Sequence, residues 1–123
     1  AGAHMSAYCT SMGRIMLAAL PPADAADILN RSQLIAYTDR TKADLPAITT
    51  ELAVVAAQGF AVIDQELELG LCSIAIPLLN TQGQTVAALN IGAQTARAST
   101  SHMIAHFLPL MRKVQAELRP LLR

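Results

Sequence analysis

The pattern of apolar and polar positions predicts helices in the first half of the chain. After Thr10-Ser11, where either hydroxyl can cap a helix, apolar residues recur at helical spacing. The apolar face of this first helix would carry Met12, Ile15, Met16 and Ala19. Pro21-Pro22 ends the helix, and proline at a first helical position can open a second, short helix over residues 24–31.

A third helix is predicted after a polar loop at residues 37–42. Asp44 is a natural N-cap, Pro46 stands close to the first helical position, and Gly59 occurs where a helix should stop. The apolar stripe between them consists of Leu45, Ile48, Leu52 and Val55.

The second half of the chain alternates between strand and helix patterns. Residues 60–63 are strand-like and continue toward Glu66, and residues 73–79 and 85–91 form a strand pair joined by a turn containing Gly83. Ser99 caps a long final helix that reaches about Leu122, with Pro109 kinking it or marking its true start. Three strands are few for so many apolar helices. Either the chain self-associates, or strands from a preceding segment complete the sheet, and we favour the second explanation.

Composition places the chain among folded single domains. Its 123 residues are 53% hydrophobic and 15% charged, which excludes disorder. The net charge is 0, so bulk electrostatics cannot hold DNA or an anionic membrane. Two cysteines are too few for a disulfide scaffold, which favours a cytoplasmic protein. Residues 1–5 resemble a vector remnant, and no apolar run is long enough to span a membrane.

Several chemically active side chains have ordinary structural interpretations. His102 and His106 have a spacing that can place two imidazoles on a metal, but no further ligand is near, so we predict surface histidines, no metal and no cofactor. Cys9 is interpreted as a buried thiol in preference to a nucleophile. A heptad-like seam in the last helix predicts core packing in preference to an interface, through Ile104, Phe107, Met111, Val114, Leu118 and Leu121.

Two motifs leave functional alternatives open. Asp64, Glu66 and Glu68 alternate, so an extended strand would put all three on one side, as a solvated edge or as carboxylates lining a pocket. The helix start at residues 10–13 exposes backbone N–H groups that suit a carboxylate, although an ordinary capped helix fits these residues equally well.

Four ordered segments resemble the effector-binding domain of IclR-family transcriptional regulators, in the branch that controls aromatic-acid and β-ketoadipate catabolism. The first comprises Tyr8-Cys9-Thr10-Ser11-Met12-Gly13-Arg14 and Leu17-Ala18-Ala19-Leu20-Pro21. The others are Gln58-Gly59-Phe60-Ala61, residues 64–71 followed by Ser73-Ile74-Ala75-Ile76-Pro77, and Ala87-Ala88-Leu89-Asn90-Ile91 with Arg97-Ala98-Ser99. The resemblance covers essentially everything after Met5.

The resemblance implies a fold, a site and partners. The fold would be α/β (α+β), GAF-like or profilin-like, an antiparallel sheet flanked by helices, with its first strands and the winged helix-turn-helix domain missing. Residues 6–123 would then be the C-terminal portion of a sensing domain that is not an enzyme. Its partners would be a small organic or aromatic acid, DNA through the missing domain alone, and copies of itself in a homodimer or homotetramer, with no membrane. The implied effector contacts are Ser11, Met12, Gly13, Ile63, Asp64, Leu71, Ser73, Asn90 and Gly92.

One departure and two alternatives accompany this hypothesis. Relatives in the branch usually carry Arg where Cys72 stands, so any contact made by that arginine is in question. Asp64 is expected to accept a hydrogen bond from an effector hydroxyl or to hold a backbone amide, with Glu66 and Glu68 pointing elsewhere. The alternatives are a small α/β enzyme that uses the carboxylates and Cys9, and a pure oligomerisation module.

Overall fold

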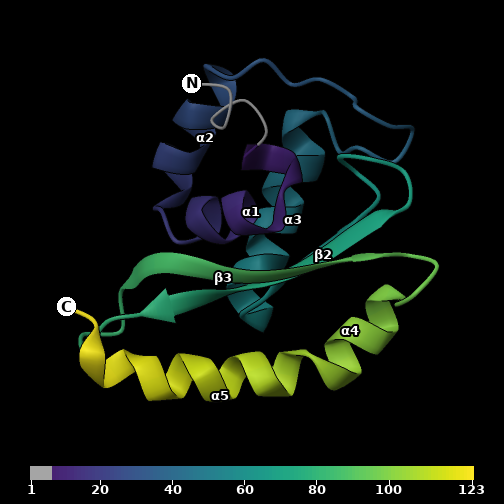
Figure 1. Cartoon of the computed structure of the whole chain (residues 1–123). Coiled ribbons are helices and arrows are strands. Elements are labelled where there is room, and N and C mark those ends of the chain that lie inside the picture. Colours follow the sequence, from purple (N-terminus) through teal and green to yellow (C-terminus); the bar gives the residue numbers. More distant parts are fainter. Residues whose placement is uncertain (1–6) are drawn as a thin grey trace.

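The computed structural model describes residues 7–123, so the predicted vector remnant at residues 1–5 lies outside the described residues. Its helices are α1 (Ser11–Ala18), α2 (Pro22–Asn30), α3 (Leu45–Gln58), α4 (Thr100–His106) and α5 (Leu108–Leu118), with a 3-10 turn η2 (Arg119–Leu121). The strands β1 (Ala61–Asp64), β2 (Leu71–Leu79) and β3 (Thr85–Gln94) form an antiparallel sheet in the order β1-β2-β3. Helices α1 and α2 lie on one side of this sheet and α4 and α5 on the other (Figure 1). The predicted antiparallel sheet flanked by helices is confirmed.

Local sequence signals define the ends of the helices on the α1 side of the sheet. The side chain of Thr10 caps α1 by accepting from the Gly13 amide, and Asp44 caps α3 by accepting from Ala47. Pro22 opens α2, and Gly59 ends α3 with a positive φ of 82°, a conformation that glycine adopts without steric cost. These boundaries agree with the predicted caps and stops.

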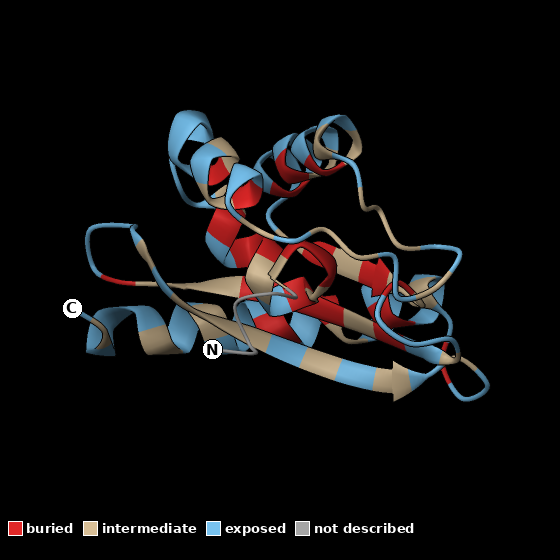
Figure 2. Cartoon of the chain, turned by 90° about the horizontal axis from the view of Figure 1, so that it is seen from above, coloured by how far each residue is buried: buried red, intermediate tan, exposed pale blue. Residues whose placement is uncertain are grey.

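Because side chains alternate along the strands, each face of the sheet has its own buried cluster. One face packs on α4 and α5 through a buried cluster that includes Cys72, Ile74, Ile76, Met103 and Met111. The opposite face meets α1 and α3 through Ile15, Val55, Ala61 and Ala75. Buried residues therefore concentrate where the helices cover the middle of the sheet (Figure 2).

The buried face of α1 differs from the predicted one. It carries Ser11, Arg14, Ile15 and Leu17. Met12 and Met16 are 43% and 41% exposed. The apolar pattern misplaced this face because it excluded Arg14, which is fully buried by pairing with Glu66. The two methionines therefore lie on an exposed edge of the helix.

The three alternating carboxylates do not share a strand face. β1 ends at Asp64, and Gln65 takes a positive φ of 62°, which turns the chain out of the sheet. Glu66 is buried against Arg14, whereas Glu68 is exposed. The prediction of one extended strand through Glu66 was wrong, since the alternation of side chains holds only while the backbone stays extended.

The long final helix is interrupted, as its proline predicted. Phe107 separates α4 from α5, and Pro109 occupies the first turn of α5. Of the heptad-like seam, Met111 is buried, whereas Ile104, Val114 and Leu121 are exposed. The expectation that the whole seam packs in the core was therefore wrong for Ile104, Val114 and Leu121. Within the described residues, no helix has the length and apolar character that a membrane span requires.

Candidate functional site

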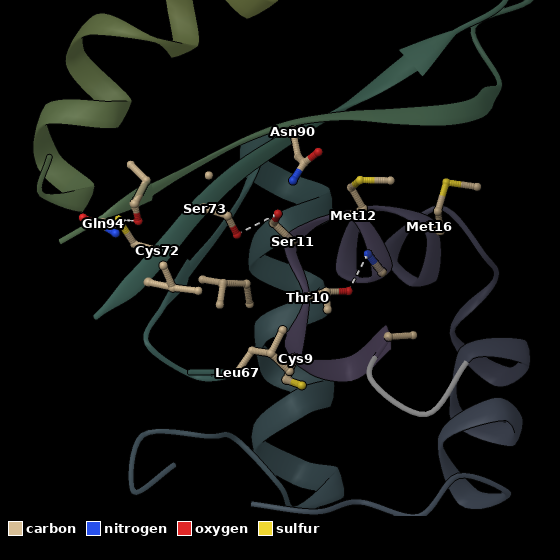
Figure 3. Close-up of a pocket in the computed structure, with 16 residues that line it drawn as sticks. Cys9, Thr10, Ser11, Met12, Met16, Leu67, Cys72, Ser73, Asn90 and Gln94 are labelled. Atoms are coloured by element: carbon tan, nitrogen blue, oxygen red, sulfur yellow. Dashed lines mark hydrogen bonds between the residues drawn. The ribbon is translucent and has the colours of Figure 1, made fainter. Parts of the chain in front are cut away.

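A cavity of about 800 Å³ opens between the N-terminal end of α1 and the sheet (Figure 3). Its walls come from the chain leading into α1, from β1, from the β1–β2 connection, and from β2 and β3. The sixteen lining residues are Ala7, Cys9, Thr10, Ser11, Met12, Gly13, Met16, Ile63, Leu67, Leu71, Cys72, Ser73, Asn90, Gly92, Ala93 and Gln94. The volume is within the range of small-molecule sites, and the wall is mostly apolar with a few polar groups.

Strand register brings the sheet residues of the cavity together. Ile63 pairs with Ser73 across β1 and β2, and Ser73 pairs with Gly92 across β2 and β3. Residues two apart in a strand share a face, so Leu71 lies beside Ser73, while Asn90 and Gln94 flank Gly92. Because Gly92 has no side chain, the middle of this wall stays open.

The start of α1 forms the opposite wall. The Gly13 amide donates to Thr10 Oγ1 at 3.1 Å, and the Arg14 amide donates to the Thr10 carbonyl at 3.0 Å. Within the described residues, the amides of Ser11 and Met12 have no such acceptor, as expected for the first turn of a helix. Gly13 therefore lines the cavity, but its N–H group is already used by the cap.

A hydroxyl pair joins the two walls. Ser73 Oγ donates to Ser11 Oγ at 2.9 Å, and this bond connects β2 directly to the first turn of α1 (Figure 3). Asn90 lies on β3, on the same side of the sheet, and is exposed. These hydroxyl and amide groups can both donate and accept hydrogen bonds, so the polar part of the wall is neutral.

Eight of the nine predicted contact residues line this cavity, and Asp64 does not. Ile63 and Asp64 are neighbours in β1, and neighbours in a strand point to opposite faces. Asp64 pairs in register with Cys72 on the face that meets α4, and its carboxylate accepts from Arg40 at 3.4 Å and from Gln65 at 3.2 Å. Asp64 thus faces away from the cavity that Ile63 lines.

Sequence reasoning missed several residues of the wall. Met16 lies one turn after Met12, and Gln94 lies two residues after Gly92, so helical and strand periodicity could have added both. Leu67 lies in the irregular β1–β2 connection, where no periodic signal exists. Thr10 was predicted as a cap, and the structure places it at the wall as well.

A buried ion pair holds α1 against the β1–β2 connection. The Arg14 guanidinium donates to both carboxylate oxygens of Glu66, at 2.9 and 2.6 Å, and to the Tyr8 carbonyl at 2.8 Å. The amide of Lys42 donates to the same carboxylate at 2.9 Å. The pair ties α1 to the β1–β2 connection, and Arg14 is not among the residues that line the cavity.

Both cysteines are buried thiols. Burial raises the pKa of the Cys9 thiol to about 11, and the nearby Arg14 offsets part of this effect. Burial, with a smaller contribution from Asp64, also raises the pKa of Cys72. Cys72 Sγ lies 3.4 Å from Met103 Sδ, so the thiol packs under α4, although Cys72 also borders the cavity. An arginine at position 72 would project from the same face of β2, the face that packs on α4.

The two histidines of α4 are both exposed, with ring centroids 4.3 Å apart. Within residues 7–123, no group of three or more His, Cys, Asp or Glu side chains is arranged to hold a metal ion. His102 and His106 are therefore surface residues.

The class of protein follows from comparison with known sequences. Residues 1–118 match the family described as "Bacterial transcriptional regulator IclR C-terminal", and the chain belongs to this family. It is 44% identical over 110 residues to the Pca regulon regulatory protein of Pseudomonas putida, covering 89% of this chain and 38% of that one. It is 35% identical over 120 residues to the p-hydroxybenzoate hydroxylase transcriptional activator of Acinetobacter baylyi, covering 98% of this chain and 44% of that one. The chain thus spans about two-fifths of the length of these relatives.

Solved structures agree with the fold. The inducer-binding domain of a PobR double mutant from Acinetobacter, in complex with 3-hydroxybenzoic acid, superposes with a TM-score of 0.91 at 34% identity. That match covers 94% of this chain and 66% of the other. The C-terminal domain of the Escherichia coli regulator KdgR superposes with a TM-score of 0.78 at 29% identity, over 91% of this chain and 70% of the other.

Proposed function

We propose that the chain is the effector-sensing part of a bacterial transcriptional regulator, and that an aromatic acid binds in the cavity between α1 and the sheet. The observation that carries this proposal is the cavity itself, whose walls hold eight of the nine residues that the family resemblance implied. The complex of a relative's inducer-binding domain with 3-hydroxybenzoic acid supports an aromatic ligand.

The bound acid would span the two walls. Its carboxylate would meet the amides of Ser11 and Met12, where the dipole of α1 favours negative charge by about 0.3–1 kcal/mol. A second polar group on the ring would meet the Ser73 hydroxyl or the Asn90 amide. Leu71 and Met12 would cover the ring faces, and their burial by the ligand would supply the apolar part of the affinity.

Catalysis is the weaker alternative. Two of the residues that such an enzyme would use are not poised for chemistry. The raised pKa of Cys9 keeps its thiol protonated near neutral pH, and Glu66 is occupied by Arg14. Relatives are described as transcriptional regulators. We therefore propose a binding function without turnover.

Contact with DNA would be made elsewhere in the regulator, in the cytoplasm. The chain has a net charge of 0, whereas specific DNA binding needs clustered Lys and Arg around a recognition element. A mobility-shift experiment at low salt on the regulator's own promoter should show no specific retention by this chain alone. Sequence-specific retention would contradict this part of the proposal.

The effector site is tested by ligand screening and two substitutions. A thermal-shift screen of protocatechuate, 3- and 4-hydroxybenzoate and β-ketoadipate should identify a stabilising acid. Ser73→Ala and Asn90→Leu should each weaken its binding about 5- to 150-fold, or about 1–3 kcal/mol, because a buried polar group of the ligand loses its partner.

The matched control is Ser101→Ala, which removes an exposed hydroxyl from α4, outside the cavity. This variant should bind the acid like the unmodified protein. Equal affinity for the unmodified protein and for both cavity variants would show that the ligand binds somewhere else.

A further inference from the structure

Two polar cross-links connect the first turn of α1 to the segment that runs from the β1–β2 connection into β2. Ser73 Oγ donates to Ser11 Oγ at 2.9 Å (Figure 3). The Arg14 guanidinium donates to both carboxylate oxygens of Glu66, at 2.9 and 2.6 Å. Ser11 and Arg14 are three residues apart and belong to the same buried face of α1. The cross-links therefore anchor this turn at both of its ends.

The residues between the anchors line the cavity. On α1, Met12 and Gly13 lie between the two anchored residues, and both are part of the wall. On the facing segment, Leu67 and Leu71 lie between the two anchored partners, and both are also part of the wall. The ion pair lies outside the lining, at one end of these two stretches. A bond between the ends of two stretches constrains how far apart the stretches can lie.

Glu66 is itself held in place by the loop between α2 and α3. The Lys42 amide donates to Glu66 Oε1 at 2.9 Å, and the Lys42 ammonium lies 3.7 Å from Oε2. Thr41 Oγ1 donates to the Glu66 carbonyl, and Thr38 Oγ1 donates to the Gln65 carbonyl at 2.7 Å. The carboxylate is thus a fixed partner for α1 and not a side chain that can follow a moving helix.

From these contacts we infer that Arg14 and Glu66 are positioning residues of the effector site: their bond sets the separation of the α1 wall from the β1–β2 wall, and thereby the affinity for the effector, without touching the ligand. This inference rests on the proposed function of the cavity. A guanidinium fork on a carboxylate fixes direction as well as distance. Apolar packing is not directional, so it would hold α1 on the sheet without fixing the walls in this way.

Glu66→Gln tests the inference directly. The side chain keeps its size, but one carboxylate oxygen becomes an amide group that cannot accept from Arg14. Calorimetric titration uses the acid among 3-hydroxybenzoate, 4-hydroxybenzoate and protocatechuate that binds the unmodified protein most tightly. The affinity of the folded variant, whose folding is checked by circular dichroism, should fall at least about tenfold. Arg14→Lys, which keeps the charge but loses the fork, takes its place if Glu66→Gln does not fold.

The double variant, Arg14→Met with Glu66→Leu, separates positioning from stability. Apolar side chains in place of a buried ion pair leave no uncompensated charge, so the double variant should be more stable than Glu66→Gln. The directional bond between the walls is still missing. The double variant should therefore bind the acid at least about tenfold more weakly than the unmodified protein. If its affinity returns to within about twofold of the unmodified protein, the pair acts through stability alone and the inference is overturned.

Two controls complete the comparison. Met111→Ala removes a buried side chain from the cluster on the opposite face of the sheet, so it should lower stability and leave the affinity within about twofold. Glu68→Gln removes an exposed carboxylate from the β1–β2 connection and should change neither quantity.

Two results would also overturn the inference and leave the proposed function intact. One is unaltered affinity in Glu66→Gln, and the other is a loss of affinity in Met111→Ala as large as in Glu66→Gln. If no acid binds the unmodified protein, the proposed function fails and this inference fails with it.

Discussion

The thiol of Cys9 is fully buried next to the start of α1. Its raised pKa of about 11, against an ordinary value of 9.0, means that the folded state holds the thiol proton more tightly than the unfolded state does. As the pH rises from about 9 through 11, the unfolded chain loses this proton first. The contribution of Cys9 to the free energy of unfolding should therefore be fully present below pH 9 and should be lost as the pH rises through 11.

Urea denaturation at several pH values between 8 and 11 measures the effect. The Cys9→Ala variant should lose less stability over this interval than the unmodified protein. It should still lose some, because the pKa values of Tyr8 and Cys72 are also raised by burial. If the free energy of unfolding of the two proteins depends on pH in the same way, Cys9 ionises equally readily in the folded and unfolded states.

At the scale of the elements, the Arg14–Glu66 pair determines how α1 lies on the sheet. Glu66→Gln leaves the Arg14 charge buried without its carboxylate, so the free energy of unfolding should fall by about 3–5 kcal/mol. Replacing both residues, as in Arg14→Met with Glu66→Leu, should cost less than the single change, because no uncompensated charge remains.

The exposed pair of Arg31 and Asp27 provides the comparison. Its side chains are 72% and 66% exposed, so Asp27→Asn should change the stability by no more than about 0.5 kcal/mol. Chemical denaturation of the three variants gives these values directly. A loss of less than 1 kcal/mol in Glu66→Gln would mean that the buried pair does not stabilise the position of α1.

Close contact between α1 and the preceding chain makes Gly13 sensitive to substitution. A Cβ at this position would lie 2.3 Å from the Ala7 carbonyl oxygen and 2.6 Å from Thr10 Oγ1. Gly13→Ala must therefore displace the wall of the cavity, and we expect a loss of about 1–3 kcal/mol in stability together with weaker effector binding.

Gly59→Ala is the matched substitution at the end of α3. A Cβ there meets no atom within 4 Å, so only the positive φ is strained, at a cost of about 1–2 kcal/mol. Effector affinity should be unchanged in this variant. Thermal melting and titration of both variants separate the two effects, and unaltered binding by Gly13→Ala would contradict the tight contact.

The ends of the helices were predictable because their signals lie close together in the sequence. Part of the site was not, because it depends on residues that are far apart in the sequence. Thr10, Asp44 and Gly59 act within their own helix turns, so their signals are readable without tertiary structure. Arg14 and Glu66 are 52 residues apart. Their pairing makes Arg14 part of the buried face of α1, and no local sequence pattern indicates this pairing. Asp64 entered the predicted site together with Ile63 through the family resemblance, whereas strand alternation lets only one of two adjacent residues face the cavity.

At the scale of the whole molecule, apolar side chains remain exposed on α4, α5 and η2. They include Leu110 at 63% exposed and Leu121 at 75% exposed, with Ile104 and Val114 nearer 40%. We expect two copies of the chain to associate through these residues, since burial of such side chains is favourable by about 25 cal/mol per Å².

Light scattering at increasing protein concentration measures this association. Leu110→Lys and Val114→Lys should shift the distribution toward monomer. A Glu117→Lys variant, which changes an already polar and exposed position of α5, should not. A monomer at every concentration would contradict the expected interface.

The position of two methionines at the edge of α1 affects how the shape of the cavity can change. Met12 and Met16 are unbranched and lie at the opening, so their rotamers can adapt to rings of different substitution without movement of the backbone. Substitutions at these two positions alter the shape of the cavity and leave the buried pair, the cap and the sheet register untouched. A regulator built this way can acquire a new effector by exchanging side chains at its entrance, at little cost to folding.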